Sequence, residues 1–238
     1  MNVYAYCLSD EIAADALGAV TGVGGATTRL LWRDGVAAVV SDFDGDAVAV
    51  TRENVLAHER VVGAMLARAT PLPFRFGTVM GEERLMSYVA AQSEALKAQL
   101  ERVRGCVEMS VKVIWKAEAV GVESSPEHAA ESAGSAESGA GTAFLLAKRR
   151  EIFGEEAKAV RAKEITEWLA GWLAGAVRDA RVEVNPHGAM VVSAAYLVER
   201  GQLAEYRERL RLAREERRDL HFLTSGAWSP YSFTSARA

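Results

Sequence analysis

Apolar residues recur with a period of two in several short segments of the first half of the chain, which predicts β-strands. A short apolar run covers residues 3–8, and two β-rich runs cover residues 27–32 and 36–41. The turn between the last two contains Asp34-Gly35, a strong signal for a β-hairpin. In residues 107–115 apolar side chains occupy every second position, so we expect a strand with one buried face.

Three segments of the same half have the period of an amphipathic helix. Ser9-Asp10 can cap a helix near residues 11–20, and Thr51 can cap a second helix that runs to about Ala69. A third, long helix is predicted over residues 82–103 and ends before a glycine.

The second half of the chain begins with a long helix from about residue 142. It is followed by a hairpin with strands at residues 180–184 and 189–198, joined by an Asn-Pro-His-Gly turn. An amphipathic helix is expected over residues 202–218, and a last strand over residues 220–225. This order of elements favours a modified ferredoxin-like α/β sandwich.

Residues 117–141 differ in composition from both flanking parts. They contain five glutamates and no basic or aromatic residue. Small and acidic residues bury too little apolar area to offset the entropy of ordering, so we interpret this segment as a linker that proteases should cut, releasing two folded halves. The sequence thus predicts an α+β protein of two domains, with an N-terminal α+β domain at 1–116 and a C-terminal ferredoxin-like domain at 142–238.

The overall composition is that of a globular protein, with 50% hydrophobic and 25% charged residues. No apolar stretch approaches the roughly 20 residues of a membrane span, and the N-terminus lacks the pattern of a secretory signal. The net charge of −4 argues against a dedicated nucleic-acid binder. Arginines and glutamates are interleaved through residues 206–218, which is typical of a solvated helix face. We expect Cys7 and Cys106 to be reduced and buried.

Candidate catalytic and metal sites are weak. The acidic residues of Asp42–Asp46 have the spacing of a calcium loop, but Ala47 stands where the sharp turn requires glycine. Gly22–Gly25 is not followed by the third glycine that a dinucleotide-binding loop requires. The four histidines are scattered, and His58, on an apolar helix stripe, is interpreted as a core residue. We therefore predict no catalytic, metal-binding or cofactor-binding residue and no enzymatic activity.

The segment Pro71–Val79, with the sequence PLPFRFGTV, is the first of two unusual motifs. Two prolines at the start of a strand place that strand at a sheet edge or delay its beginning. Arg75, which stands between two phenylalanines, either points to solvent or pairs with a carboxylate. The candidate structural or interaction residues of this motif are Pro73, Arg75, Phe76 and Gly77.

The second motif is SGAWSPYSF, at residues 225–233. Its aromatic side chains either pack into a groove of their own molecule or stay exposed as anchors for a partner. We favour packing because exposed apolar tails invite aggregation, and Trp228→Ala should then cost roughly 3–5 kcal/mol of stability. The candidate residues here are Trp228, Pro230, Tyr231 and Phe233.

At these motifs the chain resembles the gas vesicle F and L proteins, the GvpF/GvpL family, and the resemblance covers nearly the whole chain. It extends to the initial VYAYCL, to the helix with His58, to the strand GCVEMSVKVIW and to AAYLVER. The family usually ends in Gly-Pro-Trp-Pro-Pro-Tyr-Ser-Phe. Ala227 and Ser229 replace two of these prolines here, so the tail should be less rigid, while its aromatic residues keep their spacing.

The resemblance implies an N-terminal α+β domain and a modified ferredoxin-like C-terminal domain. It also implies a non-enzymatic accessory or minor structural protein, cytoplasmic and at the gas vesicle. Such a protein would bind the apolar shell protein and other gas vesicle accessory proteins during nucleation and assembly, and would prevent shell-protein aggregation. No cofactor, nucleic acid or membrane is expected. The alternative is a small-molecule-binding or catalytic α/β domain, with a polar pocket near Arg75 or His58.

Overall fold

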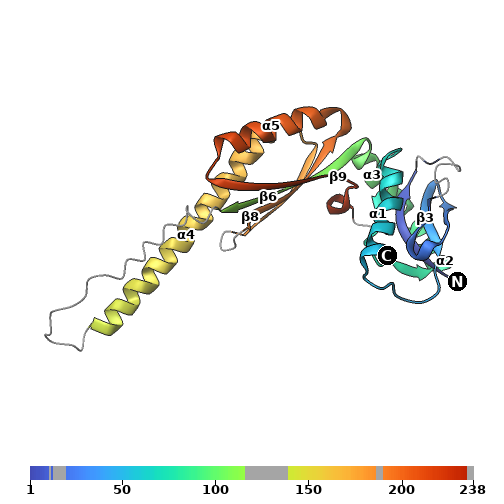
Figure 1. Cartoon of the computed structure of the whole chain (residues 1–238), viewed down its shortest axis with the longest axis horizontal. Coiled ribbons are helices and arrows are strands. Elements are labelled where there is room, and N and C mark those ends of the chain that lie inside the picture. Colours follow the sequence, from blue (N-terminus) through green and yellow to red (C-terminus); the bar gives the residue numbers. More distant parts are fainter. Residues whose placement is uncertain (11, 13–19, 116–138, 186–189, 235–238) are drawn as a thin grey trace.

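The computed structural model describes the chain except for residues 11, 13–19, 116–138, 186–189 and 235–238, and in the long helix that begins at Gly139 it describes side chains from residue 156 onward. Most of the predicted linker, the predicted helix at 11–20 and the turn of the second hairpin lie outside the described residues. Figure 1 shows two β-sheets, each with its own helices, that meet side by side.

The first sheet is antiparallel and has the strand order β2-β3-β1-β4, with β5 also paired to β1. Its strands are β1 (Asn2–Ser9), β2 (Thr28–Arg33), β3 (Val36–Asp42), β4 (Leu72–Pro73) and β5 (Val79–Gly81). The predicted hairpin is confirmed by β2 and β3. Asp34 and Gly35 form its turn with positive φ angles of 49° and 80°, which glycine adopts without a steric cost.

Helices cover both faces of this first sheet. They are α1 (Arg52–Leu66), α2 (Glu82–Ala91) and α3 (Ser93–Val103), with a short 3₁₀ turn η1 (Val23–Gly25). The core on one face contains residues of α1, and the core on the other contains residues of α2 and α3. The side chain of Thr51 accepts a hydrogen bond from the Asn54 N–H at 3.2 Å, which confirms the predicted cap. The single helix expected at 82–103 is broken at Gln92, whose φ and ψ of −111° and 10° are not helical.

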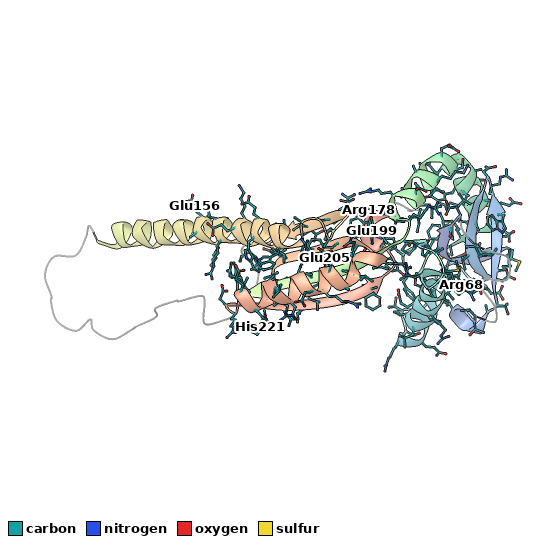
Figure 2. The ribbon with its side chains drawn as sticks, turned by 90° about the horizontal axis from the view of Figure 1, so that it is seen from above. Arg68, Glu156, Arg178, Glu199, Glu205 and His221 are labelled. Atoms are coloured by element: carbon teal, nitrogen blue, oxygen red, sulfur yellow. The ribbon has the colours of Figure 1, made fainter. Side chains whose placement is uncertain are left out.

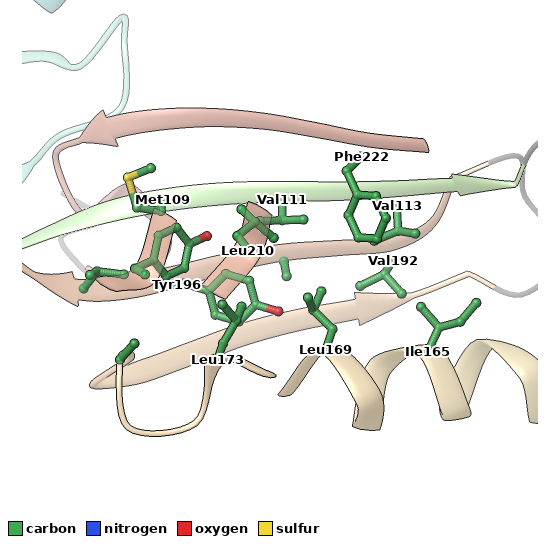
Figure 3. Packing of buried hydrophobic residues seen from close by; sticks show 14 of the residues in the cluster. Met109, Val111, Val113, Ile165, Leu169, Leu173, Val192, Tyr196, Leu210 and Phe222 are labelled. Atoms are coloured by element: carbon green, nitrogen blue, oxygen red, sulfur yellow. The ribbon is translucent and has the colours of Figure 1, made fainter. Parts of the chain in front are cut away.

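The second sheet is also antiparallel, with the order β7-β8-β6-β9. It contains β6 (Cys106–Trp115), β7 (Asp179–Val184), β8 (Met190–Glu199) and β9 (Leu220–Trp228), together with the helices α4 (Gly139–Leu173), η3 (Arg200–Gln202) and α5 (Leu203–Glu216). Side chains of α4 and α5 pack on one face of this sheet, as Figure 3 shows for Leu169, Leu173 and Leu210.

The placement of β6 corrects the domain division expected from the sequence. That division puts the strand in the N-terminal domain, but β6 pairs with β8 and β9 in the middle of the second sheet. The change from the first sheet to the second therefore falls between α3 and β6 rather than near residue 116. Residues 116–138 connect β6 to α4, two elements of the same second unit.

Hydrogen bonds between the two units surround the start of β6. The Thr70 hydroxyl donates to the Cys106 carbonyl at 2.9 Å. The guanidinium of Arg178 donates to the carbonyls of Arg102 and Arg104 at 3.1 and 3.0 Å, and it pairs with Glu199 at 2.8 Å. Figure 2 shows Arg178 and Glu199 at this junction.

The first part of α4 extends beyond the second sheet, as Figure 1 shows. Residues 156–160 are exposed, and the buried stripe of the helix begins at Ala162. Among the described residues, no helix has both the length and the apolar character that crossing a membrane requires.

Candidate interaction site at the C-terminal tail

The chain beyond β9 returns to the junction between the two units. Ser229 and Pro230 are buried, and the next three residues form the 3₁₀ turn η4 (Tyr231–Phe233). Phe233 is 3% exposed and packs in the same core cluster as Val103 of the first unit and Leu197 of the second. The tail therefore fills a space to which both units contribute.

Glu108 of β6 holds the tail in place. Its carboxylate accepts hydrogen bonds from the Ser232 backbone N–H at 2.7 Å and from the Ser232 hydroxyl at 2.8 Å. Burial raises the pKa of Glu108, while the two bonds from Ser232 oppose that rise by favouring the charged form. A carboxylate that is 7% exposed needs such partners, so the tail and β6 stabilise each other.

Tyr231 connects the tail to α1. Its hydroxyl lies 3.1 Å from His58 Nε2 and donates to the Glu59 carboxylate at 2.8 Å. In the tautomer that fits these two bonds, the phenolic proton goes to Glu59 and the imidazole donates from Nε2 to the Tyr231 oxygen. His58 Nδ1 is then an acceptor for the Tyr4 hydroxyl, 2.9 Å away, and the Tyr4 oxygen in turn accepts the Gly77 N–H at 3.0 Å.

His58 is consequently a neutral, fully engaged imidazole. It is 1% exposed, and burial lowers its pKa to about 4. Burial also raises the pKa of Tyr4 to about 12. Since both ring nitrogens of His58 already have partners, the group offers no free base to a substrate. The structure thus supports the interpretation of His58 as a core residue.

Residues of the motif at 71–79 also contact the cluster around His58. Pro73, in the two-residue edge strand β4, pairs with Cys7, which agrees with the edge position expected for a strand that begins with prolines. The ring of Phe76 lies 5.9 Å from that of His58. Gly77 has a φ of 88°, which glycine adopts without a steric cost, and its N–H donates to the Tyr4 hydroxyl.

Arg75 is exposed, which agrees with the solvent alternative of the sequence analysis. No ion pair of Arg75 is found within the described part of the chain. The two phenylalanines beside it differ, because Phe74 is fully buried and Phe76 is half-buried.

The expectation of a packed tail is confirmed for two of its rings and wrong for the third. Tyr231 and Phe233 pack within the molecule, whereas Trp228 is 46% exposed at the end of β9 and its Nε1–H donates to the Ser225 hydroxyl at 3.3 Å. The large stability loss expected for Trp228→Ala therefore does not follow from the structure. Leu223, also on β9, is 57% exposed.

Four residues of this site were not singled out by the sequence: Tyr4, Glu59, Glu108 and Ser232. Glu108 occupies a polar position in the alternation of β6, and alternation alone predicts that such a position faces water. The tail, more than 100 residues later in the chain, covers it instead. No local signal could show this, because the partner is distant in sequence.

The described residues hold no group of three or more histidine, cysteine or acidic side chains that could bind a metal ion. Cys7 and Cys106 are buried and free, as expected. A hollow of about 430 Å³ lies on the uncovered face of the second sheet, lined by Glu108, Ser110, Arg181 and other residues. Its lining includes Ser232 of the tail but neither Arg75 nor His58, the two residues around which the alternative function needs a pocket.

The fold and the site define a two-unit α+β protein whose terminal aromatic tail contacts both units. The chain belongs to the family described as gas vesicle synthesis protein GvpL/GvpF, whose sequence model matches residues 2–235. The resemblance stated from the motifs is thereby confirmed.

Individual relatives agree with this assignment. The chain is 31% identical over 193 residues to gas vesicle protein L2 of Halobacterium salinarum, covering 76% of this chain and 68% of the relative. It is 30% identical over 233 residues to gas vesicle protein L of a Streptomyces species, covering 89% and 85%.

Solved structures share the fold. The crystal structure of the gas vesicle protein GvpF from Anabaena sp. PCC7120 superposes with a TM-score of 0.77 at 17% identity, covering 100% of this chain and 97% of that one. GvpF from Microcystis aeruginosa gives 0.76 at 21% identity, covering 98% of each. The α+β fold is thus confirmed. Its family gives the chain a role connected with gas vesicles.

Proposed function

We propose that this chain is a non-enzymatic accessory or minor structural protein that binds the apolar gas vesicle shell protein and other accessory proteins during nucleation and assembly. The observation that carries the proposal is membership of the GvpL/GvpF family over nearly the whole chain. Both ring nitrogens of His58 have hydrogen-bond partners within the protein, which supports a role without catalysis. The protein would act in the cytoplasm and at the growing vesicle.

Exposed apolar residues of β9 are the contact surface in this proposal. Leu223 and Trp228 are 57% and 46% exposed on a strand at the edge of its sheet. A subunit that builds a gas-facing wall carries apolar surface that aggregates before assembly. Large exposed side chains such as tryptophan are effective anchors for such a surface, and covering it would keep the subunit available.

The test is co-expression of the tagged full chain with the shell protein and with the other gas vesicle accessory proteins, followed by affinity capture. We expect capture of the shell protein and an increase in its soluble fraction. A Leu223→Ser/Trp228→Ala variant should lose shell protein, whereas Trp32→Ala, which removes a tryptophan 48% exposed on β2, should not. Capture of none of these proteins by the wild-type chain would refute the proposal.

A further inference from the structure

A groove between α5 and β9 is a second feature of this edge of the molecule. It is a hollow of about 290 Å³. One wall comes from Arg207, Arg211 and Arg214 of α5, and the other from residues 224–226 of β9. Figure 1 shows the helix and the strand next to each other on the outer side of the second unit.

The three arginines form one stripe, because residues four and seven positions apart lie on the same face of a helix. All three side chains are exposed. Arg211 is neutralised by Glu208 at 2.7 Å and by Glu215 at 2.5 Å. Arg207 and Arg214 have no carboxylate within ion-pair distance in the described part of the chain. The groove therefore has two positive charges available to a ligand.

The other wall offers backbone hydrogen-bonding groups. β9 ends the strand order of its sheet, so every second residue directs its N–H and C=O away from β6 and toward solvent. Phe222 points into the core under α4 and α5, so Thr224 lies on the arginine side of the strand and Leu223 on the opposite face. A strand added to this edge would contact charge on one face and apolar surface on the other.

We propose that β9 accepts an extended segment of a partner protein as an added strand, with carboxylates facing Arg207 and Arg214 and apolar side chains on the face of Leu223. Seven residues along α5 span about 10.5 Å, and alternate residues of a strand are about 6.7 Å apart. Two acidic residues two or four positions apart can therefore each reach one guanidinium. The inference deepens the proposed function and rests on it only for the statement that the partner is a gas vesicle protein.

A nucleic acid would use the arginines but not the strand edge. Its phosphates could pair with the guanidinium groups, but its backbone offers no ladder of alternating donors and acceptors to β9. The net charge of −4 also opposes it. An acidic extended peptide is the ligand that uses both walls of the groove.

The test uses the purified full chain and a fluorescent nine-residue peptide of alternating valine and glutamate. Binding is followed by fluorescence anisotropy at low salt. We expect saturable binding that weakens as salt rises, and loss of binding when the peptide nitrogens that face β9 are methylated. Replacing both groove arginines, in Arg207→Gln/Arg214→Gln, should weaken binding about tenfold. Arg60→Gln/Arg84→Gln makes the same charge change on exposed residues of the first unit and should bind as the wild type does.

Three results would overturn the inference: no binding to the wild-type chain, equal binding by the groove variant and its control, or binding that survives backbone methylation. A single-stranded oligonucleotide that displaces the peptide and binds more tightly would show an anion site instead of a strand site. Because the peptide assay contains no vesicle protein, its failure leaves the capture experiment of the proposed function standing. Failure of the capture experiment likewise leaves the peptide result intact.

Discussion

Removal of the Phe233 ring tests the proposed role of the tail as a contact between the two units. The side chain is 3% exposed and belongs to a core cluster with residues from both units. Phenylalanine to alanine in a core costs about 3–5 kcal/mol. The lower end applies here, because η4 is a single 3₁₀ turn outside both sheets and can shift toward the space that the ring leaves. We therefore expect Phe233→Ala to lose about 3 kcal/mol.

For a chain of this size, that loss corresponds to a fall in melting temperature of about 6–12 °C. Urea denaturation followed by circular dichroism measures the loss, with thermal melting as a second readout. The matched control is Trp228→Ala, in the same tail segment but 46% exposed, which should change stability by less than about 1 kcal/mol. The tail does not hold the units together as described if Phe233→Ala has the same stability as the wild type, or if Trp228→Ala lowers stability more than Phe233→Ala does.

Two further predictions concern His58 and the connection between β6 and α4. Burial lowers the pKa of His58 to about 4. As the pH falls below about 6.5, the imidazole is therefore protonated in the unfolded chain but stays neutral in the folded chain. The free energy of unfolding should fall by up to about 3 kcal/mol between pH 6.5 and pH 4. In urea denaturation between pH 7 and pH 4.5, the midpoint of His58→Gln should fall less than that of the wild type. If the two midpoints fall equally, His58 is not buried as assigned. Cleavage at a protease site inserted between residues 120 and 135 should leave the two fragments associated on gel filtration, because β6 stays paired with β8 and β9. Separation of the fragments without denaturant would contradict that sheet order.

The sequence was sufficient wherever the determining interaction is local. Asp34-Gly35 predicts the hairpin because only residues that tolerate positive φ close so tight a turn. Thr51 predicts a helix start because its hydroxyl reaches an N–H three residues later. The prolines before Phe74 predict an edge because they cannot donate to a neighbouring strand. The family, too, could be named from its two motifs.

The tertiary structure decided everything that depends on residues distant in the chain. The alternation of 107–115 shows a strand but not its neighbours, so only the pairing with β8 and β9 moved β6 to the second sheet. The same alternation predicted a solvated Glu108, because no pattern within a strand records that Ser232 will cover it.

The three rings of the tail illustrate the same limit. By composition Trp228, Tyr231 and Phe233 are equivalent candidates for burial, and the sequence analysis treated them together. Tyr231 is fixed by hydrogen bonds to His58 and Glu59, and Phe233 by a space that exists only when both units are folded, while Trp228 remains at the surface. Local sequence thus determined which elements form, whereas burial and polar partners were set by packing between segments that only the fold brings together.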